Sequence, residues 1–157
     1  MDYKGRLVRL RQAMDRHKLD AVLITHPPNI QYLCGFAGST GALVMAERVC
    51  FFTDGRYTEQ ALAEVQGSRI KIARKSALAA AAQWLGSSKL RRIGIEAQHL
   101  RVAERAVVAS AVGKGSKLVD APPIVEELRE VKDQDEIASI RRSCALDRKS
   151  TRLNSSH

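Results

Sequence analysis

Apolar and polar residues alternate in short blocks along this chain, and their spacing switches repeatedly between a helical and an extended period. Leu7, Leu10 and Met14 recur with basic residues between them, which predicts an amphipathic helix near the N-terminus. Short apolar runs bounded by Gly, Pro, Asn or Asp predict strands at residues 21–25, 42–45, 49–53, 70–72, 93–95 and 118–119. The short connection between the second and third runs predicts a hairpin.

Helical segments separate most of these strands. Asn29 is predicted to cap a short helical turn, and Ser76 is predicted to cap an Ala-rich helix that stops at Gly86. A further helix, lined by Ala103, Ala106 and Val107 on its apolar side, is predicted to close at Gly113. Helices that alternate with short strands predict a layered α/β domain, and the hairpin predicts a mixed sheet within it.

The chain changes character after the prolines at 122 and 123. Asp133, followed three positions later by Glu136, forms a capping-box pattern at the start of another helix. That helix carries an apolar stripe of Ile137, Ile140 and Cys144. No later segment offers the stripe a packing partner, so we expect this helix to connect to another domain.

The expected organisation is one domain over residues 1–127, the start of a linker helix over 128–147 and a tail over 148–157. The tail ends in K-S-T-R-L-N-S-S-H, which resembles translated sequencing-adapter sequence at the end of a truncated reading frame. The alternative is a disordered polar C-terminus, and both interpretations exclude the tail from the fold.

Composition and charge narrow the class of protein. Hydrophobic residues make up 45% of the chain and charged residues 27%, which is typical of a globular domain. The net charge of +9 comes from scattered Lys and Arg, without an aromatic stacking cluster, and this disfavours nucleic-acid binding. No apolar run approaches membrane-spanning length, no secretory signal is visible, and the three cysteines lack a C-x-x-C pair. These features predict a cytoplasmic protein.

Few residues offer chemistry. The four histidines show no metal-binding spacing, and each is predicted to be an isolated surface residue. Gly35, Gly38 and Gly41 form a loop with special backbone geometry, but it lacks the order of a P-loop or a dinucleotide fingerprint. Cys34 is predicted to be a small buried hydrophobe rather than a nucleophile.

The segment T-D-G-R-Y at residues 53–57 is more informative. Asp54 is suited to cap the following helix and Gly55 to form the turn. Arg56 would then lie just beyond a strand end, where α/β proteins commonly place binding groups, and its planar fork suits a carboxylate. The alternative is a solvated arginine with no binding role.

Three segments together resemble the N-terminal domain of the creatinase/prolidase/aminopeptidase P family. They are N-I-Q-Y-L-C-G-F-A-G-S-T-G at residues 29–41, T-D-G-R-Y at 53–57 and L-R-E-V-K-D-Q-D-E-I at 128–137. They occur in the family's order and the resemblance extends over about residues 5–147. The longer form T-D-G-R-Y-T-E-Q-A is similar to Xaa-Pro aminopeptidases and dipeptidases rather than to creatinase itself.

The resemblance implies a three-layer, ribonuclease H-like domain around a mixed sheet of about six strands. It also implies a following "pita-bread" catalytic domain, whose two Asp, one His and two Glu hold two divalent metals, commonly Mn²⁺, that support cleavage of the bond preceding proline. None of those ligands can be carried over to this chain, so no cofactor is expected in it. Arg56 occupies the position of an arginine near the substrate site of aminopeptidases P.

The leading hypothesis is therefore a non-catalytic N-terminal domain of an Xaa-Pro peptidase, inactive alone. The resemblance implies that it contributes to a homo-oligomer and covers the active site of the catalytic domain, its expected partner. The alternative is a stand-alone interaction or dimerisation module without peptidase activity. An in-frame continuation encoding the metal-binding domain would favour the first hypothesis, and a genuine stop codon the second.

Overall fold

The computed structural model describes the backbone of residues 1–154 and the side chains of residues 1–146. Its strands are β1 (Ala21–Ile24), β2 (Ala42–Met45), β3 (Val49–Asp54), β4 (Arg69–Ala73), β5 (Arg92–Ile95) and β6 (Lys117–Asp120). Its helices are α1 (Tyr3–Arg16), α2 (Pro27–Cys34), the 3₁₀ turn η1 (Gly55–Tyr57), α3 (Thr58–Glu64), α4 (Ala77–Gly86), α5 (Val102–Val112), α6 (Ile124–Glu130) and α7 (Gln134–Asn154).

The six strands form one sheet in the order β4-β3-β2-β1-β5-β6. β2 runs antiparallel to both of its neighbours, and the remaining pairs are parallel. The hairpin pairs Met45 with Val49 at its closed end and Ala42 with Phe52 at its open end. The predicted mixed sheet of six strands flanked by helices is confirmed.

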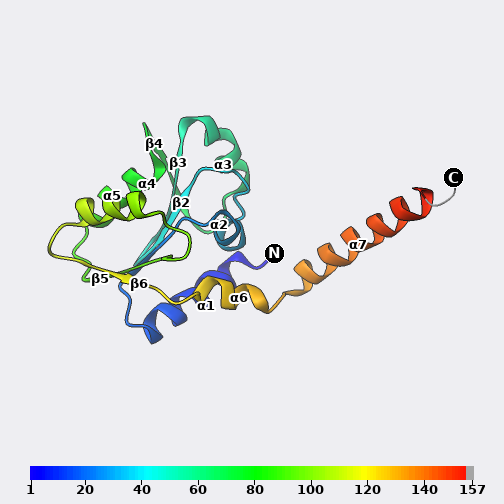
Figure 1. Cartoon of the computed structure of the whole chain (residues 1–157), viewed down its shortest axis with the longest axis horizontal. Helices are drawn as coiled ribbons and strands as arrows, with labels where there is room; N and C mark the ends of the chain where they lie inside the picture. Colours follow the sequence, from blue (N-terminus) through cyan, green and yellow to red (C-terminus); the bar gives the residue numbers. More distant parts are fainter. Residues whose placement is uncertain (155–157) are drawn as a thin grey trace.

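Helices cover both faces of the sheet (Figure 1). Successive strand residues point to opposite faces, so that Val22 and Ile24 pack with α1, α2, α3 and α6 on what we call the α1 face. Ala21 and Leu23 pack with α4 and α5 on the opposite, α4 face. The domain therefore has three layers, with its two apolar clusters separated by the sheet.

The glycine-rich loop between α2 and β2 needs glycine for two different reasons. Gly35 ends α2 in the left-handed region with a φ of 88°, as a helix C-cap. Gly38 and Gly41 allow close approach instead, because an added Cβ would lie 2.3 Å from the ring of Phe36 and 2.7 Å from the ring of Phe51. The special geometry predicted for this loop is confirmed.

The predicted buried side of α5 was wrong. α5 buries Val108 and Val112, whereas Val107 is 45% exposed and Ala103 is exposed. The apolar residues of A-E-R-A-V-V-A-S-A-V surround that helix, so the pattern did not single out one face. Gly86 is the last residue of α4, which confirms the predicted end of that helix, and it packs there against the backbone of α5 at Ala111 without a positive φ.

The C-terminal helix α7 leaves the domain and projects away from the three layers (Figure 1). Its predicted capping box is confirmed, because Glu136 N donates to Asp133 Oδ1 at 2.8 Å and Asp133 N donates to Glu136 Oε2 at 2.9 Å. The predicted division after residue 127 falls within α6 and stays a prediction. The predicted tail at 148–157 has its side chains, and its last three residues entirely, outside the described residues.

Candidate functional site

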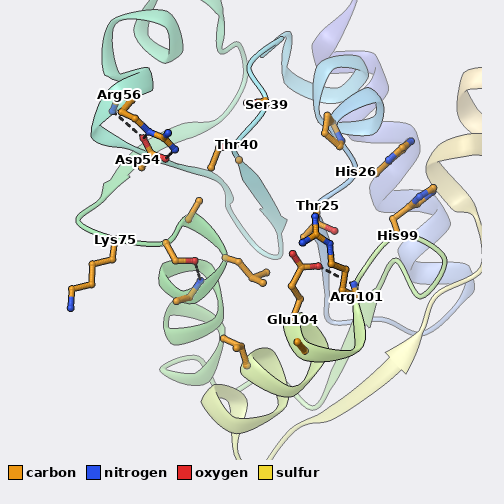
Figure 2. Close-up of a pocket in the computed structure, with 18 residues that line it drawn as sticks. Thr25, His26, Ser39, Thr40, Asp54, Arg56, Lys75, His99, Arg101 and Glu104 are labelled. Atoms are coloured by element: carbon orange, nitrogen blue, oxygen red, sulfur yellow. Dashed lines mark hydrogen bonds and ion pairs between the residues drawn. The ribbon is translucent and has the colours of Figure 1, made fainter.

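An open cavity of about 790 Å³ lies where the carboxyl ends of β1 and β3 meet the first turns of α4 and α5 (Figure 2). Open α/β sheets bind ligands at this edge, at the point where neighbouring parallel strands lead to opposite faces. β1 and β5 are parallel neighbours, and they lead to α2 on the α1 face and to α5 on the α4 face. The topology therefore makes this cavity the candidate site.

Asp54 and Arg56 form one wall of the cavity (Figure 2). Asp54 ends β3, and its Oδ1 accepts from Arg56 N at 3.0 Å, which confirms the predicted cap. Arg56 Nε and Nη2 donate to the same carboxylate at 3.0 and 2.8 Å, although the arginine side chain is 76% exposed. The guanidinium beside it holds the pKa of Asp54 below its usual value. Arg56 thus reaches solvent at the cavity wall in an orientation fixed by its neighbour.

Gly55 lies in the turn after Asp54, as predicted. Its φ is not positive, and an added Cβ would meet no atom within 4 Å. The turn itself does not require glycine at this position. The turn is held by the Asp54 cap and by Thr58 Oγ1, which donates to Gly55 O at 3.0 Å.

The glycine-rich loop and the T-D-G-R-Y turn pack against each other. The hydroxyl groups of Ser39 and Tyr57 hydrogen-bond at 2.7 Å, and Thr53 Oγ1 donates to Thr40 O, also at 2.7 Å. The Tyr57 ring meets Phe36 edge-on at 5.7 Å between centroids. Two motifs that are separate in the sequence therefore form one rigid side of the cavity.

His26 and His99 form the opposite side, and the prediction that they are isolated surface residues was wrong. Their rings stack with centroids 3.7 Å apart and 7° between the planes. His99 Nε2 also lies 3.0 Å from Glu126 Oε1. Burial, and then the charge of His99, lower the pKa of His26, which favours a neutral ring.

A buried carboxylate lies behind this pair. Glu96 follows β5 and is 8% exposed. Its Oε2 accepts from the backbone N–H groups of Thr25 and His26 at 2.6 and 2.8 Å, and its Oε1 accepts from Asn29 Nδ2 at 2.6 Å. The side chain of Glu96 therefore accepts from backbone N–H groups at the carboxyl end of β1 that could otherwise bind an external anion.

Asn29 extends the network instead of capping a helix, so that prediction was wrong. α2 begins at Pro27 with His26 as its N-cap, and Asn29 is completely buried in its first turn. Its side chain also donates to Glu126 Oε1 at 2.7 Å and accepts from Arg129 Nη1 at 2.9 Å. Burial would raise the pKa of Glu126, but the hydrogen bonds from Asn29, the backbone and His99 together lower it.

Glu104 and Cys34 have structural roles. Glu104 Oε2 caps α5 by accepting from Arg101 N at 2.9 Å. Cys34 is fully buried, and burial raises the pKa of its thiol to about 11, which confirms a hydrophobic rather than a nucleophilic side chain. The side chain of Lys75 points away from the other labelled residues (Figure 2). The cavity thus presents fixed polar groups for binding.

Within the described residues, no group of three or more His, Cys, Asp and Glu side chains is arranged to hold a metal ion. In the same part of the chain, no helix combines the length and the apolar character needed to cross a membrane. Sequence reasoning found Arg56 and its turn but missed Glu96, Asn29 and the histidine pair. A carboxylate directly after a buried strand was the available signal for Glu96.

The fold defines a small α/β domain with an open cavity at the carboxyl edge of its sheet. Residues 6–131 match the model of the Creatinase/Prolidase N-terminal domain family, and the chain belongs to that family. Over 133 residues it is 35% identical to an uncharacterized peptidase, YqhT, of Bacillus subtilis (strain 168). That match covers 84% of this chain and 37% of the relative, so the chain spans little more than a third of that protein.

Solved structures of related proteins agree. The N-terminal domain of the cytoplasmic peptidase PepQ from Mycobacterium tuberculosis H37Rv is 34% identical, with a TM-score of 0.74, covering 80% of this chain and 98% of that one. The aminopeptidase P structure from Streptococcus thermophilus is 30% identical, with a TM-score of 0.72 and coverages of 82% and 99%. An Xaa-Pro dipeptidase from Bacillus anthracis is 26% identical, with a TM-score of 0.80, covering 87% of this chain and 38% of that one.

Proposed function

We propose that this chain acts as the non-catalytic N-terminal domain of an Xaa-Pro aminopeptidase or dipeptidase. One observation carries the proposal: the chain covers 98% of the isolated PepQ N-terminal domain but 38% of the Bacillus anthracis dipeptidase. The bond-breaking chemistry then belongs to a catalytic domain that follows. Two divalent metals in that domain, commonly Mn²⁺, supply the activation of water for peptide hydrolysis.

In this proposal the domain covers the active site of the catalytic domain, contributes to a homo-oligomer and works in the cytoplasm. The cavity at the carboxyl edge of the sheet supports the covering role, because its polar groups are fixed by Glu96 and by the packed motifs. Arg56 is the proposed substrate-binding residue. Its exposed guanidinium is already oriented by Asp54, so a peptide carboxylate or carbonyl could bind without ordering a free side chain.

The test uses a chimera in which residues 1–146 of this chain replace the matched N-terminal part of YqhT. We expect the isolated chain to release no residue from Xaa-Pro peptides with Mn²⁺ present, and the chimera to do so. The remainder of YqhT without its N-terminal part is the matched control and should be less active than the chimera. Hydrolysis by the purified isolated chain would refute the proposal, and an inactive chimera together with a stably dimeric isolated chain would favour a stand-alone dimerisation module.

A further inference from the structure

Arg6 is a charged side chain held inside the domain. It lies in the first turns of α1 and is 1% exposed. Its Nη1 donates to the carbonyl oxygen of Tyr32 in α2 at 2.8 Å, and its guanidinium lies 4.2 Å from the centroid of the Tyr32 ring. One side of the guanidinium therefore belongs to the packed core of the domain.

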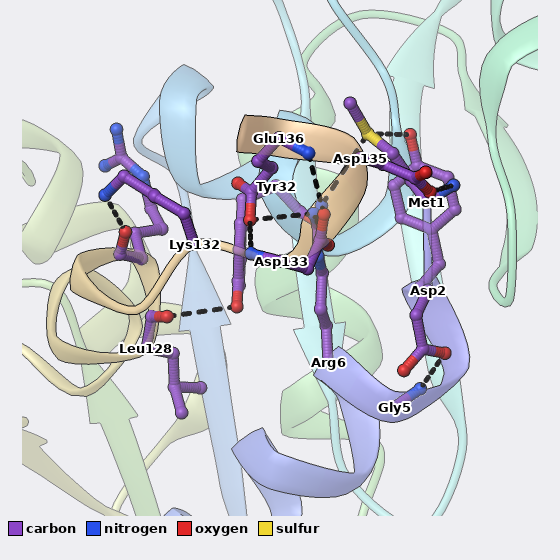
Figure 3. A network of polar contacts seen from close by, with 12 residues as sticks. Met1, Asp2, Gly5, Arg6, Tyr32, Leu128, Lys132, Asp133, Asp135 and Glu136 are labelled. Carbon is purple, nitrogen blue, oxygen red and sulfur yellow. Dashed lines mark hydrogen bonds and ion pairs between the residues drawn. The ribbon is translucent and has the colours of Figure 1, made fainter. Parts of the chain in front are cut away.

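The other side of Arg6 binds the beginning of α7 (Figure 3). Its Nη2 lies 2.5 Å from Asp133 Oδ2 and 3.3 Å from Glu136 Oε2. These two carboxylates are the partners of the capping box that starts α7. Arg6 thus binds the cap itself, and the cap can form this contact only when the first turn of α7 is in place.

The rest of α7 makes the position of that first turn important. Ile140 is 50% exposed and Leu146 is 67% exposed, so the helix beyond its first turns is largely open to solvent. Three residues separate α6 from α7, and among them Val131 is 79% exposed. Because this connection is short and exposed, the direction of α7 depends on the contacts that the first turn of the helix makes with the domain.

The chemistry of Arg6 favours a positioning role over a role in stability. An apolar side chain of similar volume could fill the same space without a desolvated charge. The Nε of Arg6 is also buried without a hydrogen-bond partner among the described residues. The planar fork, however, satisfies a carbonyl oxygen on the domain and carboxylates on α7 from two separate nitrogens, whereas Met has no donor and Lys has a single nitrogen.

We propose that Arg6 is a positioning residue that fixes the direction in which α7 leaves the domain. The consequence for catalysis rests on the proposed function: α7 leads to the catalytic domain, and Arg6 sets how the cavity is placed over that domain. A domain that rotates freely about residues 131–133 would spend only part of its time in the productive arrangement.

The sharpest variant is Asp133→Asn combined with Glu136→Gln. Asn caps a helix as well as Asp, and Gln can replace Glu in a capping box, so the helix start is retained while both charges facing Arg6 are removed. The matched control is Glu127→Gln combined with Glu130→Gln, which removes the same charge from exposed positions of α6. Arg6→Met is the complementary variant on the domain side.

The measurement is the distance distribution between two spin labels, one on α7 and one on the domain. Cys144 is exposed on α7, whereas Cys34 and Cys50 are buried, so labelling at neutral pH is selective. The exposed Lys89 is replaced by Cys to carry the second label. We expect a narrow distribution for the parent and the control, and a distribution at least about twofold wider for the charge-removing variant.

Equal widths in parent and variant, with unchanged circular dichroism, would overturn the proposal. If Arg6→Met does not fold, the charge-removing variant decides, because it leaves the contact between Arg6 and Tyr32 intact. This test uses the chain alone and is independent of whether a peptidase domain follows. In an active chimera, the charge-removing variant should lower kcat/KM several-fold and the control should not; an inactive parent chimera would count against the proposed function only.

Discussion

The side-chain nitrogen of Asn29 donates to the carboxylate of Glu96 at 2.6 Å, across 67 positions of the sequence. This contact joins the first turn of α2 to the residue that follows β5. It lies where β1 leads to α2 on the α1 face of the sheet and β5 leads to α5 on the α4 face. The same carboxylate also satisfies two backbone donors after β1. Glu96 therefore holds together the end of β1 and the start of α2, and Thr25 and His26 between them line the cavity.

Replacing Glu96 should consequently be costly. Glu96→Gln keeps the size of the side chain but places an amide NH₂ opposite either Asn29 Nδ2 or the backbone N–H groups of Thr25 and His26, so a buried donor loses its partner. We expect the free energy of unfolding to fall by about 1–3 kcal/mol. Urea unfolding at pH 7 measures it, with the exposed Glu127→Gln expected to change stability by less than about 0.5 kcal/mol. Equal effects of both variants would contradict the structural role of Glu96.

Gly86→Ala should weaken the packing of α4 against α5 and thereby lower the stability of the domain. A Cβ at this position would lie 2.1 Å from the carbonyl oxygen of Ala111, and that backbone cannot rotate away. Alanine favours a helix over glycine by about 0.5–1 kcal/mol, but separating two packed helices costs about 1–3 kcal/mol, so the clash should dominate. Thermal unfolding should show a lower Tm for Gly86→Ala and an unchanged Tm for Gly115→Ala, where an added Cβ meets no atom within 4 Å. An unchanged Tm for Gly86→Ala would show that α4 and α5 can separate freely.

The histidine stack should make stability depend on pH. The pKa of His26 is lowered from its ordinary value of 6.5, first by burial and then by the charge of His99. The unfolded chain then binds more protons than the folded one, so stability falls as the pH decreases through 6.5 and levels off below the lowered pKa. Chemical unfolding at pH 7.5 and at stepwise lower pH should show a smaller loss for His26→Gln than for the parent.

His17→Gln is the control for this pH series, because His17 is exposed at the end of α1. Its loss of stability should match that of the parent. A parent curve that is flat between pH 7.5 and 5.5 would show that the stack does not disfavour protonation of His26.

Arg56 is the substrate-facing candidate, and its test belongs in the chimera. Arg56→Ala should lower kcat/KM by about tenfold or more, because it removes a charge-assisted hydrogen bond to the peptide. Arg56→Lys should recover only part of the loss, since it keeps the charge without the planar fork. Melting temperatures of both variants separate catalysis from folding. Unchanged kinetics in both would exclude a role in binding, and unfolding of both would assign Arg56 to structure.

The strands and most helix boundaries were predictable because they depend on local signals. The run at residues 42–45 matches β2 at both ends, and Ser76 caps α4 as predicted, accepting from Ala79 N. Arg56 was recognisable because its turn follows a strand directly. Sequence patterns identify such features because the residues that determine each of them lie within a few positions of one another.

The missed features depend on contacts between distant segments. His26 and His99 stack only because β1 and β5 are neighbours in the sheet, and no local pattern reports that pairing. Asparagine is common at helix caps, but tertiary hydrogen bonds from Asn29 to Glu96 and Glu126 hold it inside the helix instead. For α5, apolar residues on every side left the buried face undetermined until α4 packed against it.

The two outer strands of the sheet have a further consequence, for aggregation. Within residues 1–154, β4 and β6 are each paired on one side only. Arg69 and Lys71 are exposed on β4, and Lys117 and Asp120 are exposed on β6. Charged side chains along an open edge oppose the addition of a strand from another molecule. The domain is thereby protected against edge-to-edge polymerisation through its two outer strands.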